Sequence, residues 1–244
     1  MPLKGYLLQI LLPWLNVPRV RCMVKLLVDN RVIEVEEGAN LLRACLENGI
    51  YIPNLCYLES MEVPSASCRM CFVEIEGEER PVPSCTVKVR EGMEVKTDTS
   101  AVRRLQRSAL RLLLSVHRVE CGECPANKRC ELQRMARFLK MGLKPKHLEP
   151  YLKDTEIDER HPLWDYYPNR CVLCGKCIQV CQQENGQPLL SFAKRGLNTV
   201  ISFFGEEDDS DVSCEDCFAC VEICPVRAII LKKSLNPLRS QEGA

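Results

Sequence analysis

The sequence predicts an α+β fold divided into several small units rather than one large domain. Seventeen of its 244 residues are cysteine, and all but two of these fall into four groups with the close spacing typical of metal ligands. Short β-rich runs with turn residues occupy the N-terminal part, and stripes of apolar residues at helical period follow. Units well under about 100 residues bury little apolar core, so bound metal has to supply part of their stability.

The composition excludes several classes of protein. The odd number of cysteines argues against a closed disulfide framework, and no secretory signal with a small-residue cleavage site is present. Both observations favour a reducing cytoplasm as the location. The 33 basic and 33 acidic side chains give a formal net charge of zero, so nothing indicates a nucleic-acid partner.

Residues 1–22 are predicted to be an N-terminal extension, because the globular pattern begins only at Met23. The apolar run at residues 7–15 is interrupted by Pro13 and is far too short to span a bilayer, so no transmembrane segment is expected. Met23 is then the expected functional start of the chain. An amphipathic anchor that lies in a membrane interface is the alternative.

A β-hairpin is predicted at the start of the globular part. The β-rich runs at residues 24–28 and 32–35 are separated by Asp29 and Asn30, which tolerate the left-handed backbone of a tight turn. Further strands are expected at residues 70–75 and 94–97.

A helix is expected between the hairpin and the later strands. Asn40 provides a capping side chain and Gly49 provides a stop. Its inward-facing positions are Leu41, Leu42, Cys45 and Leu46. We expect Cys45 to pack in the core as a small apolar residue, not to bind metal. Cys22 has no assigned partner.

The first group of cysteines has the spacing C-x11-C-x2-C-x13-C and consists of Cys56, Cys68, Cys71 and Cys85. A hairpin, a helix and further strands with four cysteines in loops resemble the β-grasp [2Fe–2S] ferredoxin domain. The spacing differs from the plant-type C-x4-C-x2-C pattern. The wide first gap and the motif SCRMCFVEI at residues 67–75 resemble instead the ferredoxin domain of the large iron–sulfur subunit of complex I. This resemblance implies a [2Fe–2S] cluster on these four cysteines, in a domain spanning residues 23–100.

A long helix is predicted to open the next unit, residues 101–160, with Asp98 or Thr99 as its cap. Its apolar stripe consists of Val102, Leu105, Ala109, Leu112, Leu113 and Val116. Another face carries Arg104, Arg107 and Arg111. We expect this basic face to be solvated; a docking patch for an acidic partner is the alternative.

The helix leads into the second group of ligands, spaced H-x3-C-x2-C-x5-C: His117, Cys121, Cys124 and Cys130. Four such nitrogen and sulfur ligands suit either a zinc ion or an iron–sulfur cluster. The other groups favour a [4Fe–4S] cluster here, since one chain is expected to use one kind of redox centre. A short helix should follow with Leu132, Met135, Ala136 and Leu139 facing inward and Gly142 at its end.

A connector at residues 142–165 separates this unit from the last one. His147 and His161 lie in it without cysteine neighbours and are predicted to be ordinary surface histidines. The aromatic residues Trp164, Tyr166 and Tyr167 precede the next cysteines and are expected to pack over that site.

The strongest signal is an internal repeat of the pattern C-x2-C-x2-C-x3-C. Its two copies are Cys171, Cys174, Cys177 and Cys181, then Cys214, Cys217, Cys220 and Cys224. Pro225 completes the second copy, whereas Gln182 replaces proline in the first. The pattern matches the bacterial two-cluster ferredoxin, in which the fourth cysteine of each copy ligates the other cluster. One [4Fe–4S] cluster is thus assigned to Cys171, Cys174, Cys177 and Cys224, and the other to Cys181, Cys214, Cys217 and Cys220. This two-[4Fe–4S] ferredoxin domain spans residues 161–232, with a tail at 233–244.

The order of the sites resembles the diaphorase small subunit of NAD-reducing [NiFe] hydrogenases. It also resembles the N-terminal half of long [FeFe] hydrogenases and of NAD-dependent formate dehydrogenases. The first two sites are similar to the large iron–sulfur subunit of complex I, in which the fourth site is built differently. The resemblance implies one [2Fe–2S] and three [4Fe–4S] clusters.

The expected function is electron relay. No G-x-G-x-x-G loop follows a strand, so no nucleotide or flavin site is expected, and no catalytic residues are assigned. The resemblance implies a hetero-oligomer with a flavin-containing NAD(P)H-oxidising subunit and a separate catalytic subunit. We expect the catalytic subunit to be a hydrogenase first and a formate dehydrogenase second. The complex could also be an electron-bifurcating one. Whether the chain counts as an enzyme is left open. The alternatives are a stand-alone redox-sensing iron–sulfur protein and a structural zinc protein.

Overall fold

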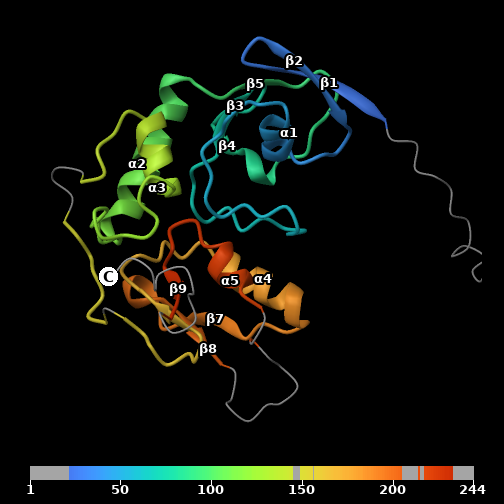
Figure 1. Ribbon diagram of the computed structural model, residues 1–244. Coiled ribbons are helices and arrows are strands. Elements are labelled where there is room, and N and C mark those ends of the chain that lie inside the picture. Colours follow the sequence, from blue (N-terminus) through green and yellow to red (C-terminus); the bar gives the residue numbers. More distant parts are fainter. Residues whose placement is uncertain (1–21, 145–148, 156, 205–213, 215–216, 233–244) are drawn as a thin grey trace, which may run out of the picture.

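The computed structural model describes residues 22–144, 149–155, 157–204, 214 and 217–232. Figure 1 shows a sheet and a helix in the N-terminal part, a pair of helices beside them, and a C-terminal part of short strands and helices. Residues 1–21, His147 and the tail at 233–244 lie outside the described residues, so the predictions made for them stay predictions. In the described part, none of the helices has the length and apolar character needed to traverse a membrane.

A mixed five-stranded sheet forms the N-terminal part. Its strands are β1 (Met23–Val28), β2 (Arg31–Glu36), β3 (Phe72–Ile75), β4 (Val82–Pro83) and β5 (Glu94–Lys96). Their order across the sheet is β2-β1-β5-β3-β4. The β1–β5 pair is parallel and the other pairs are antiparallel. A parallel pair needs a crossover, and this crossover contains all four cysteines of the first group. The two-residue strand β4 was not predicted.

The hairpin between β1 and β2 forms where the sequence predicts it. Asp29 and Asn30 have φ angles of 47° and 67°, so both central residues adopt the left-handed conformation of the tight turn. The register pairs Val28 with Arg31 directly across this turn.

The predicted helix α1 (Leu41–Glu47) packs against the sheet. The Asn40 side chain accepts a hydrogen bond from the backbone N–H of Arg43 at 3.2 Å, which confirms the cap. Leu41, Leu42 and Cys45 are buried, whereas Leu46 is only partly so. Gly49, just beyond the helix, has a φ of 73° and ends it as predicted.

Helix α2 (Ser100–Ser115) starts at Thr99, whose hydroxyl accepts from the Val102 N–H at 3.1 Å. Asp98, the other predicted cap, instead pairs with Arg103. The predicted apolar stripe is wrong in part. Leu112 is 66% exposed, while Leu110 and Leu114, which the stripe omits, are buried. The buried face is wider than one stripe because α2 packs against both β3 and helix α3. Arg104, Arg107 and Arg111 are exposed, as predicted.

Helix α3 (Glu131–Phe138) buries the four residues predicted to face inward: Leu132, Met135, Ala136 and Leu139. It ends before the predicted stop at Gly142. Lys140 adopts the left-handed conformation with a φ of 52°, so a lysine takes the position expected for glycine. Its end is fixed to α2 by Arg107, whose Nε donates to the Leu139 carbonyl at 3.1 Å, and by Arg103, which lies 4.0 Å over the Phe138 ring.

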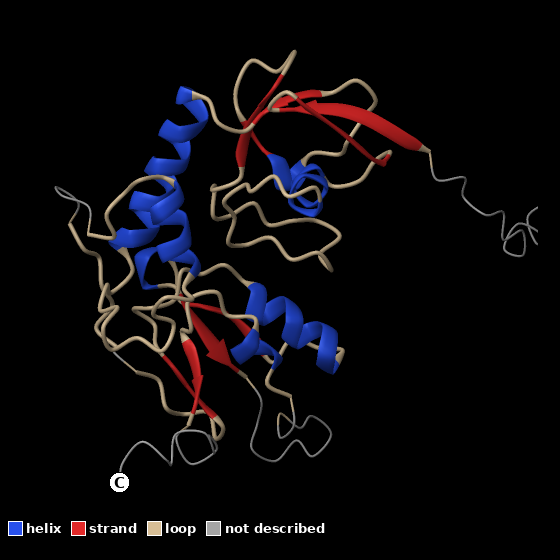
Figure 2. Cartoon of the chain, turned by 45° about the horizontal axis from the view of Figure 1, so that its top comes forward, coloured by secondary structure: helices blue, strands red, loops and turns tan. Residues whose placement is uncertain are grey.

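The C-terminal part combines two helices with two short antiparallel strand pairs (Figure 2). The helices are α4 (Lys176–Asn185) and α5 (Ala219–Glu222). The strands are β6 (Trp164–Tyr166), β7 (Leu190–Ala193), β8 (Val200–Phe203) and β9 (Ile229–Leu231). β6 pairs with β9, and β7 pairs with β8. Two short 3-10 helices, at Ser84–Thr86 and Gly196–Asn198, complete the described elements.

The prediction for His161 is wrong. Its side chain is buried, with only 3% of the residue exposed. The imidazole stacks on Trp164 with ring centroids 4.0 Å apart and meets the Phe203 ring edge-on at 4.4 Å. Of the three aromatic residues predicted to pack over the next metal site, Trp164 thus packs against a buried histidine. The sequence around His161 does not predict its burial, because neither Trp164 nor Phe203 belongs to a periodic apolar stripe.

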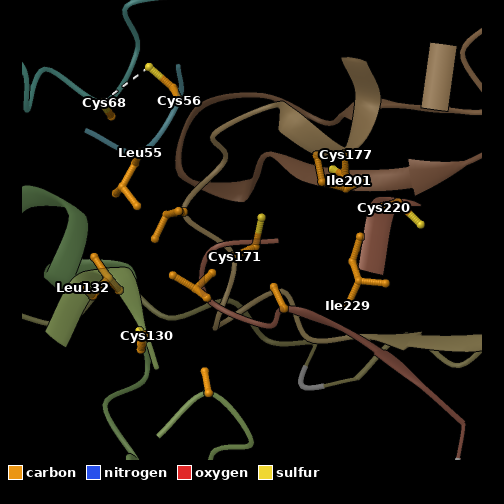
Figure 3. Packing of buried hydrophobic residues seen from close by; sticks show 14 of the residues in the cluster. Leu55, Cys56, Cys68, Cys130, Leu132, Cys171, Cys177, Ile201, Cys220 and Ile229 are labelled. Carbon is orange, nitrogen blue, oxygen red and sulfur yellow. Dashed lines mark hydrogen bonds between the residues drawn. The ribbon is translucent and has the colours of Figure 1, made fainter. Parts of the chain in front are cut away.

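The buried residues form two cores. One lies inside the N-terminal sheet and includes Cys71 and Cys85. The other runs from Leu55 and Cys56 of the first unit through α2 and α3 to α4 and β9 of the last. Figure 3 shows part of this second core, with cysteines from all four predicted ligand sets: Cys56, Cys68, Cys130, Cys171, Cys177 and Cys220.

Candidate metal centres

The first four cysteines lie together as two pairs. The Sγ atoms of Cys56 and Cys68 are 3.4 Å apart (Figure 3), and the thiols of Cys71 and Cys85 are hydrogen-bonded to each other. Cys56 also lies within electrostatic reach of both members of the second pair. All four residues are buried, with at most 6% exposed. The four cysteines of the first predicted ligand set therefore lie near one another. They are carried by the loops before β3 and by the 3-10 helix at Ser84–Thr86.

Hydrogen bonding makes the two thiols of each pair unequal. The bond with Cys68 lowers the pKa of Cys56 to about 5, and the bond with Cys85 lowers the pKa of Cys71. The same bonds, together with burial, raise the pKa of Cys68 and of Cys85. Each pair therefore favours one thiolate. Iron binding requires the second thiolate of each pair as well, and the positive charge of iron favours that ionisation.

Backbone and side-chain contacts fix the loops that carry these cysteines. Ala66 and Arg69 have φ angles of 48° and 53°, so the turn at Cys68 is built from left-handed residues without glycine. The Ser84 hydroxyl donates to the Cys71 carbonyl at 2.9 Å, and the Ser84 N–H bonds the same oxygen at 2.9 Å. Sequence analysis missed Ser84, and a serine before a cysteine gives no signal that would have found it.

His117 follows the C-terminal end of α2 and is oriented by the last unit of the chain. Its Nδ1 lies 2.9 Å from the carbonyl oxygen of Arg170, an arrangement in which Nδ1–H donates and the lone pair is on Nε2, where a neutral imidazole could bind a metal. Burial lowers the pKa of His117, which favours the neutral, ligating form of the ring.

The three cysteines that follow His117 occupy one compact loop and the start of α3. Cys130 caps α3 and is buried, whereas Cys121 and Cys124 are partly exposed. Burial raises the pKa of Cys130, and both other thiols lie within electrostatic reach of it. Backbone N–H groups of Leu132 and Gln133 at the start of α3 point at the Cys130 sulfur, so a thiolate there is stabilised.

The eight cysteines of the repeat fall into two crossed groups. The thiols of Cys171, Cys174 and Cys177 lie within electrostatic reach of Cys224, from the far copy of the motif. Cys181 in turn lies within reach of Cys214 and Cys220, which also neighbour Cys217. Helix α4 carries both Cys177 and Cys181, so one helix contributes to both groups. Cys177 also lies within electrostatic reach of Cys220, so the two groups adjoin each other, and the division of the eight cysteines between two clusters stays a prediction.

Hydrogen-bond donors point at several of these sulfurs. The backbone N–H of Leu173 lies 3.4 Å from Cys171 Sγ, and that of Ala228 lies 3.1 Å from Cys224 Sγ. The hydroxyl of Tyr166, one of the aromatic residues expected over this site, is hydrogen-bonded to the Cys171 sulfur. Such donors stabilise the ionised, iron-binding form of each sulfur and are among the factors that set cluster potentials.

The chemistry of the donors fits iron–sulfur clusters. Most of the fifteen cysteines predicted to be ligands are buried, and N–H groups face several of the sulfurs. In the described part of the chain, no three His, Cys, Asp or Glu side chains are arranged to hold a single metal ion. In a cluster each protein ligand binds a different iron corner or shares an iron with one partner, so four ligands do not converge on one atom.

Two family models match the chain. Residues 21–100 match the 2Fe-2S iron-sulfur cluster binding domain, and residues 106–143 match the NADH-ubiquinone oxidoreductase-G iron-sulfur binding region. The fold and the candidate centres thus define an iron–sulfur protein of mixed α and β structure. It carries a ferredoxin-type [2Fe–2S] domain followed by a [4Fe–4S] binding region.

Several curated proteins are similar to most of this chain. The chain is 34% identical over 210 residues to NADPH-Fe(3+) oxidoreductase subunit alpha of Geobacter sulfurreducens, covering 86% of this chain and 24% of the relative. It is 32% identical over 215 residues to NADP-reducing hydrogenase subunit HndD of Solidesulfovibrio fructosivorans, covering 85% and 36%. It is 32% identical over 221 residues to the NADH-ubiquinone oxidoreductase 75 kDa subunit of Reclinomonas americana, covering 90% and 31%. The chain thus spans about a quarter to a third of the length of these relatives.

One solved structure matches the chain over most of both chains. The crystal structure of an NAD+-reducing [NiFe]-hydrogenase in the H2-reduced state matches with a TM-score of 0.75 and 29% sequence identity, over 86% of this chain and 88% of that chain. The chain therefore resembles the iron–sulfur subunits of NAD(P)-linked hydrogenases and NADH oxidoreductases, as the order of its cysteine motifs predicts.

Proposed function

We propose that this chain is an electron-relay subunit of an NAD(P)-linked oxidoreductase complex. The observation that supports this most directly is the second core, in which cysteines of all four ligand sets are buried together (Figure 3). Centres held by one continuous core keep fixed positions relative to one another, as a relay requires. Each iron–sulfur cluster takes up one electron at a time, so a line of them divides a two-electron hydride oxidation into single steps.

The proposed ligands follow the sets that the sequence selects. A [2Fe–2S] cluster is assigned to Cys56, Cys68, Cys71 and Cys85. The first [4Fe–4S] cluster is assigned to His117, Cys121, Cys124 and Cys130. The two others are assigned to Cys171, Cys174, Cys177 and Cys224, and to Cys181, Cys214, Cys217 and Cys220. This gives a β-grasp ferredoxin domain at residues 23–100, a small helical domain at 101–160 and a two-cluster ferredoxin domain at 161–232.

The proposed partners follow from the relatives. The names of these relatives join NADH, NADPH, NADP or NAD+ to hydrogenase or oxidoreductase activity. We infer that a flavin-containing subunit delivers electrons from NAD(P)H and that a separate catalytic subunit consumes them, or the reverse. A hydrogenase is the first expectation, because this chain covers 88% of one chain from a solved hydrogenase structure. A formate dehydrogenase is the second. Bifurcation of electrons to a second acceptor is compatible with several centres in one chain.

Metal analysis and copurification test this proposal. The anaerobically purified chain should contain about 14 iron atoms, from one two-iron and three four-iron centres, and should be brown. A flavoprotein should copurify with it from its native host. Zinc as the dominant metal would reject the relay, and a fully loaded chain that binds no partner would favour the stand-alone sensor.

A further inference from the structure

The imidazole of His117 makes a hydrogen bond that leads to the next ligand set. Its Nδ1 lies 2.9 Å from the carbonyl oxygen of Arg170. Arg170 is joined by its peptide bond to Cys171, a ligand of the neighbouring proposed cluster. A path therefore leads from the His117 ring to the Cys171 sulfur. It consists of one hydrogen bond, the covalent bonds of the Arg170–Cys171 peptide and those of the Cys171 side chain.

The Arg170 peptide is held in place from several sides. The N–H of Arg118, next to His117, donates to the Asn169 carbonyl at 2.7 Å. The buried Asn169 side chain accepts from the Lys153 N–H at 2.7 Å and donates to the Lys153 carbonyl at 2.9 Å. The hydrogen bond to His117 is thus part of a fixed structure, in which Asn169 acts as a positioning residue for the carbonyl of the next residue.

A second contact joins the same two ligand sets. The N–H of Glu131, the residue after Cys130, lies 3.3 Å from the carbonyl oxygen of Pro225, the residue after Cys224. Two hydrogen bonds therefore link the two ligand sets, one from the His117 ring and one between two peptide groups. The His117 bond is the shorter of the two and starts on the metal ligand itself.

We propose that the His117 ring is the electronic bridge between its own cluster and the cluster on Cys171, Cys174, Cys177 and Cys224, so that these two centres are consecutive in the relay. This inference rests on the proposed function. With both clusters bound, a single electron would pass between the two centres by way of the His117 ring and the Arg170 peptide; the centre that gives it up would be oxidised and the other reduced. The Nδ1 proton stays on the ring, and no bond breaks.

The chemistry of histidine fits this role better than that of cysteine. A thiolate binds iron and accepts hydrogen bonds through the same sulfur atom. An imidazole has two nitrogens on one conjugated ring, so it can bind iron through one and donate a hydrogen bond through the other. Electron tunnelling decays less steeply through bonds and short hydrogen bonds than across gaps between packed atoms. A histidine at this position therefore adds a route that runs through the ring to the Arg170 carbonyl, a hydrogen bond that a thiolate, which is no donor, cannot make.

The test replaces His117 by Nδ1-methylhistidine in the full chain, which keeps Nε2 for iron and removes the Nδ1–H donor. Electron exchange between the two centres is followed after flash photoreduction through their separate EPR signals, with iron content measured on the same samples. We expect exchange to slow severalfold while the iron content stays at the wild-type value. The control Ser60→Ala removes the hydrogen bond between Ser60 and Gln183 at 3.0 Å, which joins other parts of the molecule, and should leave the rate unchanged.

The variant Asn169→Ala is a second test of the bridge that leaves His117 itself unchanged. It releases the Arg170 peptide from Lys153 and should slow exchange with the iron content preserved. If methylation expels iron from the His117 site, this variant alone decides. A wild-type exchange rate in an iron-replete variant overturns the bridge. Wild-type protein without the expected iron and EPR signals would instead reject the proposed function itself.

Discussion

The side-chain amide of Asn40 donates a hydrogen bond to the carbonyl oxygen of Cys85, 45 residues further along the chain. The oxygen of the same amide accepts from the Arg43 N–H and caps α1. One side chain therefore joins the start of a helix to the loop that holds a proposed [2Fe–2S] ligand.

Asn40→Ala should loosen both structures at once. Loss of a cap of this kind costs about 0.5–2 kcal/mol, and here the Cys85 loop also loses its anchor. We expect the variant to lose [2Fe–2S] absorbance to a chelator faster than wild type does. Thr99→Ala is the matched control, since it removes the cap of α2 without touching a ligand loop. Equal rates of cluster loss in the two variants would contradict the role given to Asn40.

The assignment of ligand and non-ligand cysteines can be tested within the first domain. Cys56→Ser should lower the iron content by about two atoms per chain, because it removes a [2Fe–2S] ligand. Cys45→Ala should keep all the iron. Cys45 is fully buried in the sheet core, and burial raises its pKa to about 12, so it remains a thiol. Iron analysis with EPR of the reduced samples distinguishes the two, and loss of iron from Cys45→Ala would reject the assignment.

Elements set by neighbouring residues could be predicted from the sequence. The hairpin turn depends on Asp29 and Asn30 alone, and the α1 cap depends on Asn40 and the residues just after it. The buried face of α2 depends instead on what packs against it. Leu110 and Leu114 are buried by elements that are distant in the sequence, so helical period alone selected the wrong edge residue, Leu112.

The same distinction holds at the candidate centres. Spacing selects the cysteines, because two or three ligands of each cluster are expected on one short loop. Spacing does not predict which backbone groups orient the ligands. The Arg170 carbonyl that bonds His117 has no side-chain signature, and any residue at that position would offer the same oxygen. The burial of His161 likewise depends on Phe203, which is 42 residues away in sequence and reaches it only in the fold.

His117→Cys should keep a cluster and lower its potential. A thiolate adds one negative charge to the centre relative to a neutral imidazole, and histidine ligation accompanies raised potentials in Rieske centres. We expect a downward shift on the order of 100 mV or more in a redox titration followed by EPR, given the range that ligand type spans. The iron content should stay unchanged. An unaltered spectrum and midpoint would show that His117 does not bind iron.

His161 should make the fold sensitive to mild acid. Burial, followed by the charge of Lys232, lowers the pKa of His161 to about 4, below the value of about 6.5 for an unfolded histidine. Between these pH values the unfolded chain binds a proton that the folded chain does not, so stability falls as pH drops from about 6.5 to 4. His161→Phe keeps a ring against Trp164 and removes that proton uptake. The variant loses the acceptor for the Leu163 N–H at 3.2 Å, a pH-independent cost of about 1 kcal/mol. Urea midpoints followed by near-ultraviolet circular dichroism should therefore show the variant gaining on wild type as the pH falls, whereas parallel profiles would contradict the neutral buried histidine.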